Sequence, residues 1–237
     1  SKGRHPSMPS ASRPASRLAG RLLLLSLGLF WGLNWPAMKI ILGELTVWWF
    51  RAFSVGVGAA GLLAIAAASG LRVRPRREDV GPLLLCALFN ILGWHMLTAY
   101  GVSQMAAGRA SIIAFTMPVW ASLLAAAILG EPITRWKVAG LGFGLAGLAA
   151  LIGPDLAALG AAPAGAAFML GAAMSWATGT VLFKRFAFGL PVASAIGWQL
   201  AFGAVVITGV AAAAEPFPDL GALSGRAVAA LGYLFAL

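Results

Sequence analysis

The first apolar run of the chain, "LLLLSLGLFWGLNWPAMKII" at residues 22–41, decides the fold class. An α-helix needs about 20 consecutive apolar residues to cross the hydrocarbon core of a bilayer. Similar runs recur along the chain, which is 60% hydrophobic and 10% charged, against about 45–50% and about 25% in soluble proteins. The sequence therefore predicts an all-α polytopic membrane protein, with the lipid bilayer as its surroundings.

Runs bounded by Gly, Pro and charged residues give eight candidate spans. They are 21–41, 45–69, 80–100, 108–130, 136–153, 165–183, 191–213 and 227–237. A signal peptide is an alternative for the first run, but that run continues too far and lacks an A-x-A-like cleavage site. Because the chain starts at Ser1 and its last run is only about half a span long, we expect a fragment of a longer protein.

The placement of positive charge predicts the orientation of the spans. Apart from the N-terminal tail, basic residues gather at 72–77, at Arg135 and Lys137, and at Lys184 and Arg185. These segments all fall on one side, which the positive-inside rule assigns to the cytoplasm together with the N-terminus. We expect localisation in the cell (inner) membrane. No basic face carries interleaved exposed aromatics, so the net charge of +10 does not indicate nucleic-acid binding.

A segment of the first span recurs in the sixth: "FWGLNWPAMK" corresponds to "MSWATGTVLFK". In both copies a lysine follows a tryptophan after eight residues, Lys39 after Trp31 and Lys184 after Trp176. Since the copies are five spans apart, they cross in opposite directions, which is typical of inverted-topology transporters. Chance similarity between two Gly- and Ala-rich helices is the alternative.

The repeat predicts the organisation of the chain. Residues 1–20 form a basic cytoplasmic tail, rich in Ser, Pro and Arg, which we expect to be disordered. A first five-helix repeat follows at 21–153, then an outer (periplasmic) linker at 154–164, then an incomplete second repeat at 165–237.

Four segments in this order resemble the EamA type of the drug/metabolite transporter superfamily. They are "FWGLNWPAMK", "WWFRAF", the run 89–134 that ends in "LGEPIT", and "SWATGTVLFK". The resemblance implies ten spans in two inverted five-helix halves, of which about eight are present, with both termini cytoplasmic. It also implies export of amino acids or related small metabolites by alternating access.

Polar groups inside the spans are candidates for substrate contact, because such groups are costly in lipid. Arg51 could snorkel to the outer interface or clamp a substrate carboxylate. Asn90, Trp94 and Thr98 follow helical spacing with His95 beside them, which predicts one polar stripe facing protein or water. A hydrogen bond between helices is the alternative role for His95.

Two prolines, Pro36 and Pro118, are predicted to break their spans beside polar residues, either as packing kinks or at a cavity. Gln199 falls at a position comparable to that of Arg51 in the repeat. The predicted substrate-binding residues are Trp31, Asn34, Arg51, Asn90, Trp94, His95, Thr116, Trp176 and Gln199. The pair Gly140-x-x-x-Gly144 predicts a close-packing helix face.

Other functions have less support in the sequence. No H-E-x-x-H, G-x-S-x-G or paired-carboxylate motif indicates an intramembrane enzyme, and nothing indicates a cofactor. A thiolate metal site is excluded because Cys86 is the only cysteine. A non-catalytic scaffold, scramblase or assembly factor remains an alternative. The expected partners are the bilayer and a small-molecule substrate, and a homodimer stays an open expectation.

Overall fold

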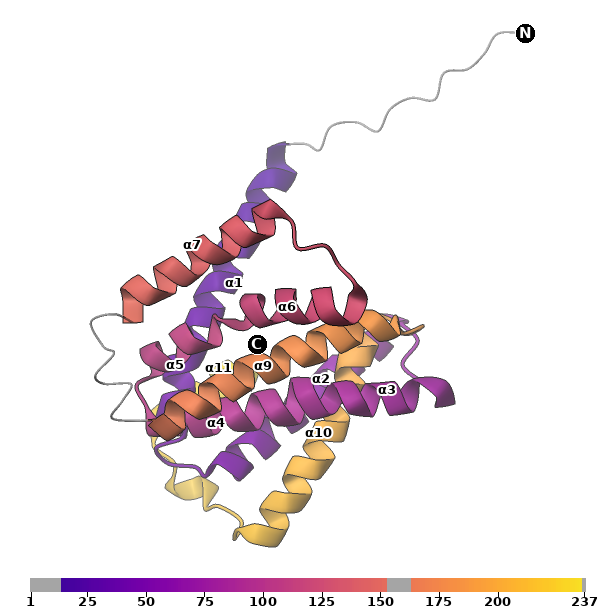
Figure 1. Ribbon diagram of the computed structural model, residues 1–237. Coiled ribbons are helices and arrows are strands. Elements are labelled where there is room, and N and C mark those ends of the chain that lie inside the picture. Colours follow the sequence, from indigo (N-terminus) through magenta and orange to yellow (C-terminus); the bar gives the residue numbers. More distant parts are fainter. Residues whose placement is uncertain (1–13, 153–162, 236–237) are drawn as a thin grey trace. The chain divides into compact units, whose positions relative to one another are not determined.

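The computed structural model describes residues 14–152 and 163–235, which are helical or lie in short connections, without β-strands (Figure 1). The all-α prediction is confirmed. The elements are α1 Pro14–Ile41, α2 Val47–Ala68, α3 Arg77–Ala87, η1 Leu88–Gly93, α4 Trp94–Gln104, α5 Ala107–Ala114, α6 Met117–Leu129, α7 Arg135–Ile152, α9 Pro163–Phe186, α10 Val192–Ala214, η3 Leu220–Ala222 and α11 Gly225–Phe235.

The chain consists of two compact units, Ser1–Asn34 and Trp35–Leu237. The boundary between the units falls within the sequence of α1. The packing described below belongs to the second unit. Of the predicted disordered tail, residues 14–20 are helical in α1, and the remainder lies outside the described residues. The predicted outer linker lies almost wholly outside them as well, since α9 begins at Pro163.

Six helical segments of the described chain are long and apolar enough to cross a membrane. They are Leu18–Ile41, Val47–Ala68, Arg77–Gln104, Ala107–Leu129, Pro163–Phe186 and Val192–Ala214. The helices α7 and α11 match the other two predicted spans in position but are not among the six. Apolar side chains such as Val205, 73% exposed, and Ile65, 64% exposed, point away from the protein. Apolar side chains on the outside of the helices are expected of a multi-pass membrane protein, because lipid surrounds them.

Small residues set the helix packing. The helix α10 packs along α2, and α9 packs along the third span and α6. Buried residues of α10 recur every fourth position, at Gln199, Gly203, Ile207 and Ala211. An added Cβ at Gly203 would lie 2.3 Å from the Ile91 side chain. Lipid offers no hydrophobic drive for helix association, so such close backbone approach supplies the packing energy instead.

The third span is one helix interrupted by a π-helical segment, since α3, η1 and α4 follow one another without a break. The hydroxyl of Ser175 in α9 donates to the carbonyl of Phe89 in η1, at 2.9 Å. A π-segment changes the angular spacing of the residues that follow, and such segments are frequent at functional sites. It directs residues of this span toward several neighbouring helices.

The fourth span breaks where Pro118 predicts, into α5 and α6. The Thr116 hydroxyl at the break donates to the Ile113 carbonyl at 2.8 Å and accepts the indole N–H of Trp120 at 3.2 Å. These bonds tie the Thr116 side chain to both sides of the break. Pro36, in contrast, lies inside α1, which remains helical to Ile41.

The predicted close-packing face of α7 has no partner among the described residues. No atom lies within 4 Å of a Cβ placed at Gly140 or at Gly144, and Phe143 between them is 82% exposed.

Candidate functional site

Arg51 is buried, with 6% of its surface exposed, and it points at α4. Its Nε–H donates to the His95 carbonyl at 2.8 Å, and Nη2 donates to the Thr98 hydroxyl at 2.9 Å. The Met38 sulfur lies 3.2 Å from Nη2, and the guanidinium lies 4.6 Å from the ring centre of Phe50. Arg51 therefore does not snorkel to the interface.

No ion pair in the described chain involves Arg51. Its Nη1 group, which carries two of the five guanidinium N–H donors, forms no hydrogen bond with a described residue. Transfer of an unpaired charge from water to the protein interior costs several kcal/mol of folding free energy. An arginine held in this way is a ready partner for an incoming anion, because its fork geometry matches a carboxylate.

His95 contributes its backbone to this contact rather than its ring. The carbonyl accepts from Arg51, while the imidazole Nδ1 is buried and has no partner among the described residues. Thr98 is 1% exposed, and its hydroxyl donates to the Trp94 carbonyl at 2.7 Å while accepting from Arg51. The proposed alternative of a hydrogen bond between helices thus holds for the His95 carbonyl.

Asn90 in η1 faces a different helix. Its Nδ2 donates to Oε1 of Gln199 in α10 at 3.0 Å, and Gln199 is 1% exposed. A Cβ at Gly179 of α9 would lie 2.1 Å from Oδ1 of Asn90, so only glycine fits there. The repeat-related residues Arg51 and Gln199 thus both contact the third span, Arg51 through α4 and Gln199 through η1.

Trp94 lies between two other tryptophans. Its ring centre is 6.5 Å from that of Trp35 in α1 and 6.5 Å from that of Trp176 in α9. The three side chains of the predicted stripe all face protein, and each meets a different partner: Asn90 meets α10, Trp94 the tryptophan pair and Thr98 Arg51.

Several buried polar atoms near these contacts have no partner among the described residues. They are Nε1 of Trp35, Oδ1 of Asn90 and Nδ1 of His95. More than nine in ten buried polar groups find a hydrogen-bond partner, roughly, in folded proteins. Donors and acceptors left open along η1 and α4 are what a polar ligand at this site would use.

The structure places six of the predicted site residues in three pairwise contacts along the third span. They are Arg51, Asn90, Trp94, His95, Trp176 and Gln199. Thr116 instead bonds within its own span at the proline break. Trp31 and Asn34 belong to the Ser1–Asn34 unit and stay predictions.

Three further contributors, Met38, Trp35 and Thr98, were not among the predicted site residues. Two of them could have been included from the sequence: Trp35 follows the predicted residue Asn34, and Thr98 lies one helical turn after the predicted residue Trp94. Met38 did not, because a methionine in an apolar span reads as packing.

Polar side chains also tie the C-terminal end of α1 and the loop that follows it to other parts of the second unit. Lys39, at the end of α1, donates to the carbonyls of Val102 at 2.8 Å and Ser103 at 3.0 Å. Glu44 accepts the Ser224 hydroxyl at 2.5 Å and the Ser224 amide at 2.7 Å. These two bonds, the hydroxyl first, lower the pKa of the Glu44 carboxyl.

The chain is similar in sequence to known membrane transporters. The chain is 32% identical over 199 residues to the uncharacterized transporter YvbV of Bacillus subtilis, covering 82% of this chain and 62% of that protein. It is 30% identical over 121 residues to a probable terminal-alkyne amino-acid exporter of Streptantibioticus cattleyicolor, covering 51% of this chain and 40% of the exporter. A solved crystal structure shares the fold, with a TM-score of 0.61, 19% identity, and coverage of 85% of this chain and 76% of the other.

The chain spans less than two thirds of the length of its first-ranked relatives, 63% and 62%. Residues 18–153, more than half of the chain, match the description of the EamA-like transporter family. The apolar helices, the polar contacts inside them and this match agree on one assignment. The chain belongs to the EamA-like transporter family, within the drug/metabolite transporter superfamily.

Proposed function

We propose that the intact protein exports amino acids or related small metabolites across the cell (inner) membrane by alternating access. The observation that carries this proposal is Arg51, a buried cation inside the second span without a counter-charge among the described residues. Its hydrogen bonds to α4 fix the guanidinium but leave Nη1 open. A substrate carboxylate would supply the missing charge through a charge-assisted hydrogen bond.

The neighbourhood of Arg51 suits a small zwitterion. The tryptophan faces around Trp94 can hold an apolar or cationic group. The relative from Streptantibioticus cattleyicolor, named as a probable amino-acid exporter, supports the same substrate class.

The proposed transport cycle uses two inverted repeats, 21–153 and 165–237, with the N-terminus in the cytoplasm. Inverted repeats allow one set of helices to rock against the other around a central site. Arg51 and Gln199, which hold comparable positions in the repeats, both contact the third span, and this fits a site at the repeat interface.

Counterflow in liposomes tests the proposal. The intact protein is reconstituted with a panel of unlabelled amino acids inside, and uptake of the labelled counterpart is measured. We expect exchange for at least one member, with loss in Arg51→Ala and in Asn34→Ala. Arg226→Ala, which removes an exposed arginine from the first turn of α11, serves as the matched control.

The absence of exchange for every amino acid would contradict the exporter function and favour the scaffold alternative. Exchange that survives Arg51→Ala would place the substrate elsewhere in the protein.

A further inference from the structure

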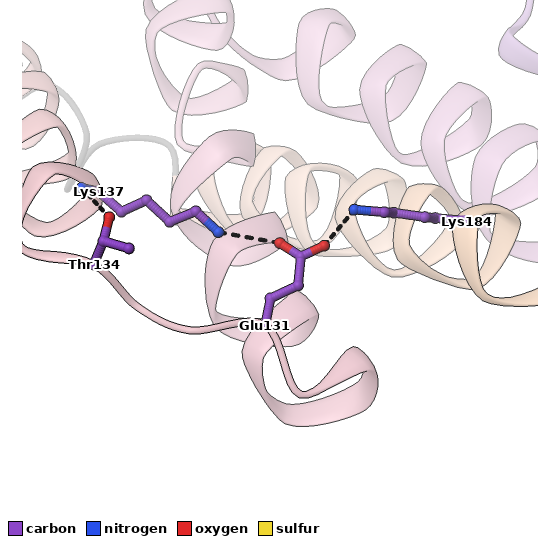
Figure 2. Close-up of polar contacts among 4 residues, drawn as sticks. All are labelled: Glu131, Thr134, Lys137 and Lys184. Atoms are coloured by element: carbon purple, nitrogen blue, oxygen red, sulfur yellow. Dashed lines mark hydrogen bonds and ion pairs between the residues drawn. The ribbon is translucent and has the colours of Figure 1, made fainter.

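One carboxylate, Glu131, joins the ends of three helices at the face that the positive-inside rule assigns to the cytoplasm (Figure 2). One of its oxygens accepts from Nζ of Lys137 in α7 at 3.1 Å, and the other accepts from Nζ of Lys184 in α9. Lys184 and then Lys137 lower the pKa of the Glu131 carboxyl through these bonds. Glu131 is therefore ionised and doubly paired at neutral pH.

The backbone around Glu131 is built to place it there. The helix α6 ends because Gly130 adopts a left-handed conformation, with φ of 67°, which turns the chain away from the helix axis. The Thr134 hydroxyl then accepts the backbone N–H of Lys137 at 3.3 Å and starts α7 (Figure 2). The positive end of the α7 dipole repels the Lys137 ammonium in the first turn of that helix, and the carboxylate of Glu131 offsets this repulsion.

Two consecutive residues of α9 hold the end of α6. Lys184 pairs with Glu131, and Nη1 of Arg185 donates to the Ile128 carbonyl at 2.9 Å. Among the ion pairs of the described residues, Lys184–Glu131 alone joins one predicted repeat to the other. The contact therefore crosses the boundary along which the two halves would move.

A crevice of about 220 Å³, open at the surface, lies between α6 and α9. Small and hydroxyl side chains line it, including Ser122 and Ala125 from α6 and Thr180 from α9, while Glu131, Lys137 and Lys184 line its charged end. The volume exceeds the roughly 30 Å³ share of one water molecule several times over. Water or a small solute could occupy it.

We propose that the Glu131–Lys184 pair, braced by Lys137, is a gate that holds the ends of α6 and α9 together at the charged end of this crevice and limits access to the crevice from the cytoplasm. The proposal rests on the transport function proposed above. The side chains of Glu131 and Lys184 are 27% and 68% exposed, and ion pairs this accessible to solvent are weak. A weak tie across moving parts can open and close in every cycle, whereas a buried pair would lock one state.

Among the described residues, no ion pair of this kind lies at the opposite ends of the helices. Lys39 holds the position of Lys184 in the other copy of the repeat, yet it bonds the carbonyls of Val102 and Ser103 rather than a carboxylate. Neutralising Glu131 should therefore weaken closure on the cytoplasmic side alone.

Cysteine accessibility tests the gate without any need for a substrate. In the intact protein with Cys86→Ala, the variant Ser122→Cys places one thiol inside the crevice. A membrane-impermeant maleimide is applied to inside-out vesicles. We expect Glu131→Gln to raise the labelling rate at least severalfold. Glu78→Gln is the matched control, because Glu78 pairs only with Arg76 on its own loop and should leave the rate unchanged.

The exchange Glu131→Lys with both Lys137→Glu and Lys184→Glu restores the two ion pairs with reversed sign and should return labelling to the slow rate. An unchanged rate in Glu131→Gln, or rapid labelling already with Glu131 intact, would overturn the gate. A rise that the reversed pairs fail to correct would show that packing, not pairing, closes the crevice. A failure of amino-acid counterflow alone would contradict the proposed function and leave these labelling rates as they are.

Discussion

Arg51 combines two properties that rarely coincide, deep burial and the lack of a counter-charge among the described residues. Burying an unpaired charge costs several kcal/mol, and methionine in place of Arg51 removes that cost while filling a similar volume. The partners would not be left unsatisfied, because the Thr98 hydroxyl keeps its bond to the Trp94 carbonyl. A substitution of Arg51 should therefore abolish transport without lowering the stability of the protein.

Arg51→Met should accordingly melt at or above the temperature of the unmodified protein, as followed by tryptophan fluorescence, while losing amino-acid counterflow. Arg226→Met provides the control for surface charge. A large fall in melting temperature in Arg51→Met would assign the arginine a structural role instead.

Ala187 is a second residue with a measurable cost. It follows the last residue of α9 with φ of 44°, in the left-handed region where a Cβ is strained. Ala187→Gly should stabilise the protein by about 1 kcal/mol, since glycine adopts this conformation freely. The same change at Ala212, an exposed position within α10, should destabilise it by about 1 kcal/mol. Thermal melting of both variants checks the opposite signs.

The third span is a helix in which a π-helical segment changes the angular spacing of the side chains. Its existence, and its bounds to within four residues (80–100 against Arg77–Gln104), followed from its apolar run, and the break before Pro118 in the fourth span followed from proline chemistry. The π-segment Leu88–Gly93 did not, because no residue type marks where a helix takes up an extra residue. The separate partners of Asn90, Trp94 and Thr98 could not be predicted either, because they depend on which helices become neighbours.

Close packing of α9 against η1 gives a prediction for this element. Gly179→Ala would place a methyl group 2.1 Å from Oδ1 and 2.9 Å from the backbone N of Asn90, so Asn90 must move and lose its bond to Gln199. We expect a cost of about 1–3 kcal/mol from overpacking. Counterflow should fall with it.

Gly171→Ala on the same helix is the matched control, because the added methyl would meet only Leu97 at 3.4 Å. Equal melting temperatures and equal transport for the two variants would contradict the role of the η1–α9 contact.

For the whole molecule, six of the eight predicted spans and the family resemblance are confirmed, since hydrophobicity and short motifs carry them. The contacts of six predicted site residues lie along the third span because polar groups within apolar spans need protein partners. The contribution of Met38 and the ties between distant loops could not be found this way, as they depend on which helices become neighbours.

The tie between Glu44 and Ser224, 180 residues apart, makes stability depend on pH. Since folding lowers the pKa of Glu44, its stabilisation is complete above the unfolded-chain pKa of about 4.3 and is lost as pH falls through the lower folded value. The melting temperature of the unmodified protein should exceed that of Glu44→Gln by a constant amount near neutral pH. The difference should shrink below about pH 4. A difference that stays constant into acid would mean that the charge of Glu44 is not involved.

The central claim is that Arg51 provides the charge that a substrate carboxylate meets inside the membrane. Its most direct test compares counterflow of an exchanged amino acid with counterflow of the corresponding amino-acid amide, in liposomes that contain the intact protein. We predict rapid exchange of the acid, little or no exchange of the amide, and loss of this preference in Arg51→Met. Equal exchange of acid and amide, or an unchanged preference in Arg51→Met, would contradict the account.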